Sequence, residues 1–349
     1  MIDFSKYVIP STTTVKEALI RLNNISDDLL TLLIVDENNI FLGSLTDGDI
    51  RRSLINGIQL EDEVKNALHK NYFYINDNNL NISTISNIKK YLIELVPHLD
   101  QNNKILKVYN FLKLKSLLPI DVVMMAGGRG ERLRPLTDSI PKPLLNIGGK
   151  AIIDYNIDEL ILNGVYNFHI TINYLADQLV NHFSKKNTNE IKYSLVKENK
   201  PLGTLGAIKL IKNFIYDHIL IMNSDLFTNI DFEDFYKTFI EEDADMAVAT
   251  IPYNINIPYA ILGYEGNKIK SFQEKPSYTY YANAGIYLIK KDLINKIPND
   301  TFYNTTDLLE TLLLENKKVI KYPIIGYWID IGRHEDLIKA QDFSKHIKT

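Results

Sequence analysis

The chain has 349 residues, enough for two domains, and 45% of them are apolar, so a sizeable core is possible. Its net charge of −4 gives no reason to expect binding to nucleic acid or to an anionic membrane. It contains no cysteine, which excludes disulfides, thiol catalysis and cysteine zinc sites. No apolar run reaches the roughly 18 residues of a membrane-spanning helix, and the first ten residues do not read as a signal peptide. We therefore expect a soluble cytoplasmic protein.

The pattern of residues 1–118 predicts a small α/β domain built from two similar copies about 60 residues apart. The first copy is predicted as a helix over Val15–Asn23, strands over Leu30–Val35 and Ile40–Leu45, and a helix from near Asp49. Either Asp47 or Asp49 is a suitable cap for that last helix. The weaker second copy is predicted as a helix over Ile85–Leu95 and strands over Val96–Leu99 and Lys104–Phe111. A linker is expected near Lys115–Pro119.

Residues 119–349 alternate strand and helix patterns, which predicts a mostly parallel, doubly wound sheet. The predicted strands are Ile120–Met125, Phe168–Ile172, Ile191–Val196 and His218–Met222; the predicted helices are Ile152–Asn163, Ala176–Phe183 and Thr204–Ile211. Ligands of such sheets bind at the carboxyl ends of the strands. The loop that follows Met125 lies at one of these ends.

That loop belongs to the most informative stretch of the chain, MMAGGRGERLRPLTDSIPKP, residues 124–143. Its three glycines let the backbone bend around a ligand, and its three arginines and Lys142 supply fixed positive charge. Exposed N–H groups ringed by cations suit a polyphosphate. The spacing matches neither a Walker A loop nor the dinucleotide fingerprint. A glycine and arginine turn of this kind is otherwise an ordinary solvated loop.

The full stretch resembles the signature of the sugar-1-phosphate nucleotidyltransferases, A-G-G-x-G-x-R-L-x-P-L-T followed by P-K-P. Glu131 departs from it, because threonine or serine is more usual there, and this leaves the choice of base open. The resemblance implies a Rossmann-like catalytic domain in which Arg134 holds the β- and γ-phosphates and Lys142 neutralises the α-phosphate. The nucleotide-binding residues that it implies are Ala126, Gly127, Gly128, Arg129, Gly130 and, further along the chain, Gly203.

Further segments match the same family in order and spacing. The segments are KENKPLGTLGAI at 197–208, NSD at 223–225, QEKP at 273–276, NAG at 283–285 and YWIDIG at 327–332. The resemblance implies that Asp225 and Asp330 hold Mg²⁺, and that Glu274, Lys275 and Asn283 bind the sugar phosphate. Taken alone, each segment has a structural alternative: PLGT as a turn, Asp225 as a cap, and Trp328 as a core side chain.

The strand–strand–helix unit of the first copy resembles a cystathionine-β-synthase (CBS) motif, and such motifs fold in pairs. In these motifs a Ser or Thr and an Asp three residues later hold a nucleotide, and Thr46 and Asp49 match that spacing. The second copy lacks both residues. The resemblance implies a regulatory domain with one purine-nucleotide site; the alternative is that Thr46 and Asp49 only cap a helix.

A CBS pair ahead of this catalytic domain resembles guanylyltransferases of bacterial surface-sugar pathways, such as those that use glucosamine-1-phosphate for legionaminic acid. We therefore expect GTP and a sugar-1-phosphate as substrates, and a homo-oligomer. Mannose- or heptose-1-phosphate, and UTP or dTTP, remain alternatives. The chain has no hexapeptide repeats, so we expect no acyltransferase half. A catalytically inactive nucleotide sensor is less favoured, because all the charged residues assigned to the chemistry are present.

Overall fold

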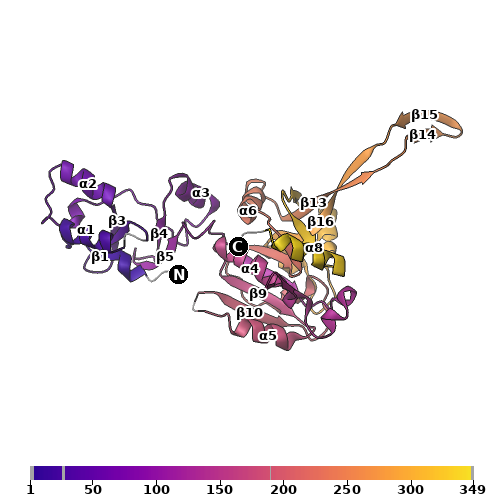
Figure 1. Ribbon diagram of the computed structural model, residues 1–349, viewed down its shortest axis with the longest axis horizontal. Helices are drawn as coiled ribbons and strands as arrows, with labels where there is room; N and C mark the ends of the chain where they lie inside the picture. Colours follow the sequence, from indigo (N-terminus) through magenta and orange to yellow (C-terminus); the bar gives the residue numbers. More distant parts are fainter. Residues whose placement is uncertain (1–3, 26–27, 189, 347–349) are drawn as a thin grey trace. The chain divides into compact units, whose positions relative to one another are not determined.

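The computed structural model of the chain describes residues 4–25, 28–188 and 190–346, which form two compact units (Figure 1). The first unit contains the described residues up to Leu118, together with Leu162–Gly164. The second contains Pro119–Ile161 and the described residues from Val165 onward. No helix among the described residues has the length and apolarity needed to cross a bilayer.

The first unit holds two groups of elements in the order that the sequence predicts. The first group is β1 (Val8–Pro10), α1 (Val15–Asn24), β2 (Thr31–Val35), β3 (Phe41–Thr46) and α2 (Asp47–Ile55). The second group is α3 (Ile82–Lys90), β4 (Leu95–Leu99) and β5 (Ile105–Asn110). The helix predicted up to Leu95 ends earlier because Leu92 takes a positive φ of 53°, which breaks the helical backbone. The linker expected near Lys115–Pro119 is not an exposed segment, because Ser116, Leu117 and Leu118 are buried.

The second unit is built on a seven-stranded sheet with the strand order β10-β9-β6-β11-β16-β13-β17. These strands are β6 (Asp121–Ala126), β9 (Asn167–Ile172), β10 (Lys192–Lys197), β11 (His218–Asn223), β13 (Met246–Asn256), β16 (Ser277–Lys290) and β17 (Val319–Pro323). Only β16 runs antiparallel to its neighbours within this sheet, so the prediction of a mostly parallel α/β fold is confirmed.

Both faces of the sheet are covered, as the apolar strand sequences require. Alternate residues such as Val123, Ile219 and Ile221 form one core cluster with the helix α7, Thr305–Leu314. The intervening residues Val122 and Met124 are equally buried on the opposite face. The remaining helices of this unit are α4 (Ile152–Leu162), α5 (Ala176–Ser184), α6 (Phe232–Glu241) and α8 (His334–Ser344).

The helix predicted over Thr204–Ile211 is wrong, because only a 3-10 segment forms, over Gly206–Leu210. The N–H of Leu205 donates to the carbonyl of Tyr303, and the N–H of Gly206 is shared between the carbonyls of Tyr303 and Leu202. A Cβ on Gly206 would lie 2.6 Å from the carbonyl oxygen of Thr301, so glycine is needed for this close approach.

A long ribbon projects from the sheet, and the sequence patterns did not predict it. The strands β13 and β16 continue beyond the core as an antiparallel pair, and the hairpin β14 (Ile261–Glu265) and β15 (Lys268–Gln273) forms the far end (Figure 1). We call residues 250–283 the arm.

Candidate active site

The candidate site lies at the carboxyl ends of the adjacent parallel strands β6 and β11. Register places Asn223 opposite Met125, where both strands end. The N–H and the hydroxyl of Ser224 donate to the carbonyl oxygen of Met125, at 3.3 and 2.7 Å. These bonds fix residues 223–225 beside the start of the glycine loop. The site therefore occupies the position where ligands of doubly wound sheets bind.

Two carboxylates predicted as metal ligands, far apart in sequence, are brought together here. Asp225 precedes the short strand β12 (Leu226–Thr228), which pairs with β18 (Trp328–Asp330) so that Leu226 faces Asp330. The N–H of Ile331 also donates to the carbonyl of Asp225 at 3.2 Å. A two-stranded pairing thus holds both side chains at one edge of the site.

Lys142 connects the two carboxylates. Its ammonium forms an ion pair with Asp225 and lies 3.8 Å from a carboxylate oxygen of Asp330. The lysine begins a 3-10 turn, Lys142–Leu144, between two prolines whose rings restrict the backbone. Its side chain is only 11% exposed, so the positive charge is fixed close to the carboxylates rather than free in solvent.

Burial and the neighbouring charge of Asp225 raise the pKa of Asp330, while Lys142 and Arg132 oppose that rise. Two carboxylates held this close need a cation between them, and Lys142 supplies one. No cluster of three His, Asp or Glu side chains able to hold a metal exists within the described residues. Two carboxylates completed by phosphate oxygens are nevertheless a set of ligands that Mg²⁺ accepts.

The glycine loop leaves the buried end of β6 at Ala126 and takes the sharp bend that its glycines allow. Gly130 has a φ of 62°, and a Cβ there would lie 2.9 Å from the Thr137 methyl group. The hydroxyl of Thr137 donates to the carbonyl of Gly130 at 2.8 Å and closes the loop. Gly128 and Arg129 are exposed, and nothing would meet a Cβ on Gly128. The loop is therefore open to a ligand at these two residues.

Glu198 is an acidic residue that sequence reasoning missed. It follows β10 and is 8% exposed, and a Cβ on Gly127 would lie 2.8 Å from one of its carboxylate oxygens. Its other oxygen accepts a bond from the N–H of Leu202 at 3.1 Å. Burial raises the pKa of Glu198. Its position directly after a predicted strand is the signal that drew attention to Asp225, and it applied equally here.

Two arginines of the loop, Arg132 and Arg134, take different positions relative to the predicted metal ligands. Arg134 pairs with Asp138 at 3.2 Å on the exposed side of the loop. Arg132, which received no role from the sequence, lies against Gly332, where a Cβ would come within 3.3 Å of its guanidinium. Arg132 also acts on the pKa of Asp330. It is therefore the arginine of the loop that the structure brings close to Asp330.

Asn283 lies at the base of the arm, where it joins the body of the second unit, and Gly203 lies on that body. A Cβ on Gly285, two residues after Asn283, would come within 2.5 Å of the side-chain nitrogen of Asn223, so this turn abuts β11. The indole N–H of Trp328 donates to the carbonyl of Ala284 at 2.9 Å, so Trp328 anchors this segment instead of only filling the core. Gly203 has a φ of 77°, and a Cβ there would lie 2.7 Å from the carbonyl oxygen of Tyr303.

Glu274 and Lys275 do not lie with the other predicted residues. Both are exposed near the far end of the arm, after β15 and before β16. Eight residues of extended chain separate Lys275 from Asn283, which corresponds to roughly 26 Å at the usual rise of a strand. The structure therefore leaves the sugar-phosphate pair away from this chain's own aspartates.

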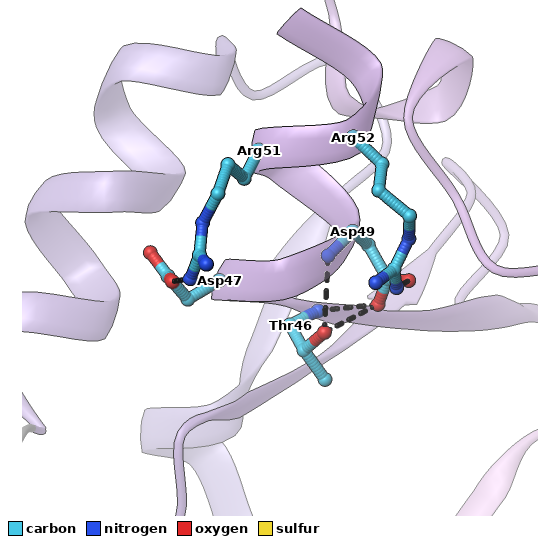
Figure 2. A network of polar contacts seen from close by, with 5 residues as sticks. All are labelled: Thr46, Asp47, Asp49, Arg51 and Arg52. Carbon is cyan, nitrogen blue, oxygen red and sulfur yellow. Dashed lines mark hydrogen bonds and ion pairs between the residues drawn. The ribbon is translucent and has the colours of Figure 1, made fainter. Parts of the chain in front are cut away.

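In the first unit, Thr46 and Asp49 bond to each other (Figure 2). The Thr46 hydroxyl accepts from the N–H of Asp49 at 3.2 Å, and the Asp49 carboxylate accepts from the N–H of Thr46 at 2.9 Å. Thr46 therefore caps α2, and the expectation of Asp47 or Asp49 as the cap is corrected. Arg52 pairs with Asp49 at 2.6 Å. A cavity of about 490 Å³ opens beside Thr46, lined by the aromatic rings of Tyr72, Phe73 and Tyr91, among others.

Residues 121–346 match the nucleotidyl transferase family, so the chain belongs to that family. It is 32% identical over 232 residues to the bifunctional protein GlmU of Methanococcus maripaludis, covering 64% of this chain and 54% of that protein. It is 26% identical over 224 residues to the mannose-1-phosphate guanylyltransferase catalytic subunit beta of Danio rerio, covering 62% of each. The chain thus spans about half to three-fifths of the length of these relatives.

Among solved structures, HddC from Yersinia pseudotuberculosis is similar, with a TM-score of 0.51 and 30% identity over 64% of this chain and 99% of that one. A structure of HddC complexed with GMP-PN gives a TM-score of 0.50 and 27% identity, over 64% of this chain and 99% of that one. The second unit is therefore a nucleotidyltransferase domain, similar to guanylyltransferases.

Proposed function

We propose that the chain transfers a nucleotidyl group from GTP to a sugar-1-phosphate, releasing pyrophosphate and forming a nucleotide sugar in the cytoplasm. The observation that carries this proposal is the contact of Lys142 with Asp225 and Asp330 beside an open glycine loop. Catalysis of this transfer requires little more than positioning and neutralisation of charge. Fixed cations and carboxylates at one edge of the sheet provide both.

The attacking oxygen of a sugar-1-phosphate is already an anion, so no general base is required. The open N–H groups around Gly128 and Arg129 receive the polyphosphate of the nucleotide. Lys142 neutralises the α-phosphate as the new bond forms, and its two prolines hold it in place. Asp225 and Asp330 would hold Mg²⁺, which supplies charge neutralisation to phosphate oxygens when bound. Arg132 offers further positive charge next to Asp330.

The choice of base is proposed from Glu198. A carboxylate only accepts hydrogen bonds, and the edge of guanine presents two adjacent donors, N1–H and the 2-amino group. Uracil and thymine present one donor between two acceptors. A carboxylate can accept only from the single donor, and the flanking acceptors repel its oxygens. The buried Glu198 next to Gly127 therefore favours GTP. The similarity to HddC, solved with GMP-PN, supports the same choice.

For the sugar, we propose glucosamine-1-phosphate, in a pathway of surface glycans or flagellin sugars such as legionaminic acid. The support is the sequence resemblance of the whole arrangement, a CBS-like unit ahead of this catalytic unit. Mannose- and heptose-1-phosphate are the alternatives, and the named relatives include a mannose-1-phosphate guanylyltransferase.

The first unit is proposed as a regulatory CBS pair that binds a purine nucleotide in the cavity beside Thr46. Aromatic rings line that cavity and suit a base, and Thr46 lies at its edge. Thr46 and Asp49 now bond to each other, so a ligand must compete with the helix cap. Calorimetric titration of AMP, ATP and GDP into the wild-type chain and an Asp49→Ala variant tests this. Identical isotherms would leave Thr46 and Asp49 as a helix cap only.

Pyrophosphate release from a matrix of nucleotides and sugar phosphates tests the main proposal. We expect the highest kcat/KM with GTP and glucosamine-1-phosphate, and dependence on Mg²⁺. A higher kcat/KM with UTP or dTTP would overturn the choice of base and leave the reaction class standing. No release with any pair would overturn the reaction itself.

A further inference from the structure

Apolar and polar cross-strand pairs alternate along the ribbon of the arm from Tyr253 to Asn256. Residues opposite each other in an antiparallel pair point to the same face, and successive pairs alternate. The apolar pairs of the ribbon are Tyr253–Tyr280 and Ile255–Tyr278, and its polar pairs are Asn254–Thr279 and Asn256–Ser277. At the far end the apolar pairs are Leu262–Phe272 and Tyr264–Ile269. These four apolar pairs place eight exposed apolar side chains on the arm.

This apolar surface is unusually concentrated. Thirty large hydrophobic side chains are exposed among the described residues, and ten of them lie within residues 253–281. A two-stranded ribbon is at best marginally stable alone in water, and an alternating pattern is typical of a ribbon with one covered face. Covering eight half-exposed side chains removes on the order of 800 Å², which matches the area that each partner of a standard interface buries.

The structure argues against the arm folding back onto its own catalytic unit. The strand β16 is continuous from its buried residues Ile286–Ile289, which pair with β11, out to Ser277 on the arm. Bringing Lys275 to its own site would mean bending the ribbon sharply at the irregularity between Val248 and Thr250, where in this structure the ribbon instead projects outward (Figure 1). The ladder therefore directs Glu274 and Lys275, both exposed, away from the site that needs them.

We propose that the arm docks on the catalytic unit of a second copy of this chain, and that its Glu274 and Lys275 complete the sugar-phosphate site of that copy. This inference rests on the proposed function, which gives these two residues their role. Two exposed apolar side chains, Leu136 and Ile140, lie between the glycine loop and Lys142 in the chain. They offer an apolar surface on which the arm of a second copy can pack. Mutual exchange of arms closes a two-fold dimer in which each site takes residues from both copies.

A mixed dimer distinguishes this arrangement from a site built within one chain. One chain carries Asp225→Ala, which disables its body, and the other carries Lys275→Ala, which disables its arm. The two chains are co-expressed with different affinity tags and purified through both tags. With exchanged arms, one site per mixed dimer combines an intact body with an intact arm, so we expect about half of the wild-type activity per dimer. With sites built within one chain, both sites are defective and activity stays at the level of the parents.

Sedimentation tests the docking independently of catalysis. We expect the wild-type chain at twice its 40.1 kDa mass, and Phe272→Asp or Tyr264→Asp at the mass of one chain. Leu314→Asp, at an equally exposed leucine at the end of α7, is the control and should leave the dimer intact. A wild-type monomer, or mixed dimers no more active than their parents when the wild type is active, overturns the inference. A wild-type chain inactive with every substrate pair refutes the proposed function and the shared site with it, while sedimentation still decides the docking.

Discussion

Replacing Lys142 by methionine removes the cation that lies between Asp225 and Asp330 and keeps most of the side-chain volume. At 3.8 Å, the attraction between Lys142 and Asp330 is about 4 kcal/mol at an effective dielectric constant near 20. The true value is smaller, because the Asp330 side chain is 41% exposed. Losing a comparable charge on a developing transition state costs about 2–4 kcal/mol. We therefore expect kcat to fall by about 30- to 1,000-fold.

The same variant should respond differently to pH and to metal. Lys142 lowers the pKa of Asp330, which burial and Asp225 raise, so its removal raises that pKa further. Asp330 must be charged to hold Mg²⁺, so the acidic limb of the pH profile should move to higher pH. The apparent affinity for Mg²⁺ at pH 8 should rise, because no ammonium competes for the carboxylates.

Initial rates of pyrophosphate release across GTP, Mg²⁺ and pH measure these effects. Lys150→Met is the matched control, because Lys150 also pairs with an aspartate, Asp158, outside the site. That variant should keep the wild-type kcat. A Lys142→Met enzyme with unchanged kcat and only a raised KM for GTP would contradict the role given to Lys142.

Asp225→Asn and Asp330→Asn should each abolish turnover while the thermal melting temperature stays within a few degrees, since neither side chain is fully buried; wild-type kcat in either variant would mark them as turn residues. Glu198→Gln should lower kcat/KM for GTP by about 10-fold or more relative to UTP, as expected for a lost acceptor pair; an unchanged ratio would remove Glu198 from base selection. In the wild type, KM for GTP should rise as pH falls toward the raised pKa of Glu198, because the protonated carboxyl loses an acceptor. Gly130→Ala should lower the free energy of unfolding by about 1–3 kcal/mol, measured by urea denaturation, because of its positive φ; no loss would mean that the loop relaxes freely.

The sheet and the place of Asp225 at its edge were predictable from sequence because they depend on local patterns. Apolar runs such as Asp121–Ala126 carry the signal of buried parallel strands, and Asp225 follows one of them directly. Glu198 carried that same signal and was overlooked. The pairing of Asp225 with Asp330 came only from the order of family segments, because 105 residues separate them and no local pattern joins them.

The arm was not predictable because no local pattern separates a strand of the sheet from a strand of a projecting ribbon. The exposed apolar residues of β13 and β16 alternate like those of any strand, and nothing in the pattern marks where the sheet ends and the projecting ribbon begins. The partner of the Arg134 side chain could not be predicted from the sequence either. Its charge pairs with Asp138, whereas Arg132 two residues earlier lies near Asp330.

Transfer of label from GTP carrying ³²P at the α-phosphate tests the central claim most directly. The wild-type chain, incubated with glucosamine-1-phosphate and Mg²⁺, should move the label into a nucleotide sugar that resists phosphatase, and the Asp225→Asn variant should not. Label that remains in GTP, or appears only in GMP with every sugar phosphate supplied, would contradict nucleotidyl transfer at the site formed by Lys142, Asp225 and Asp330.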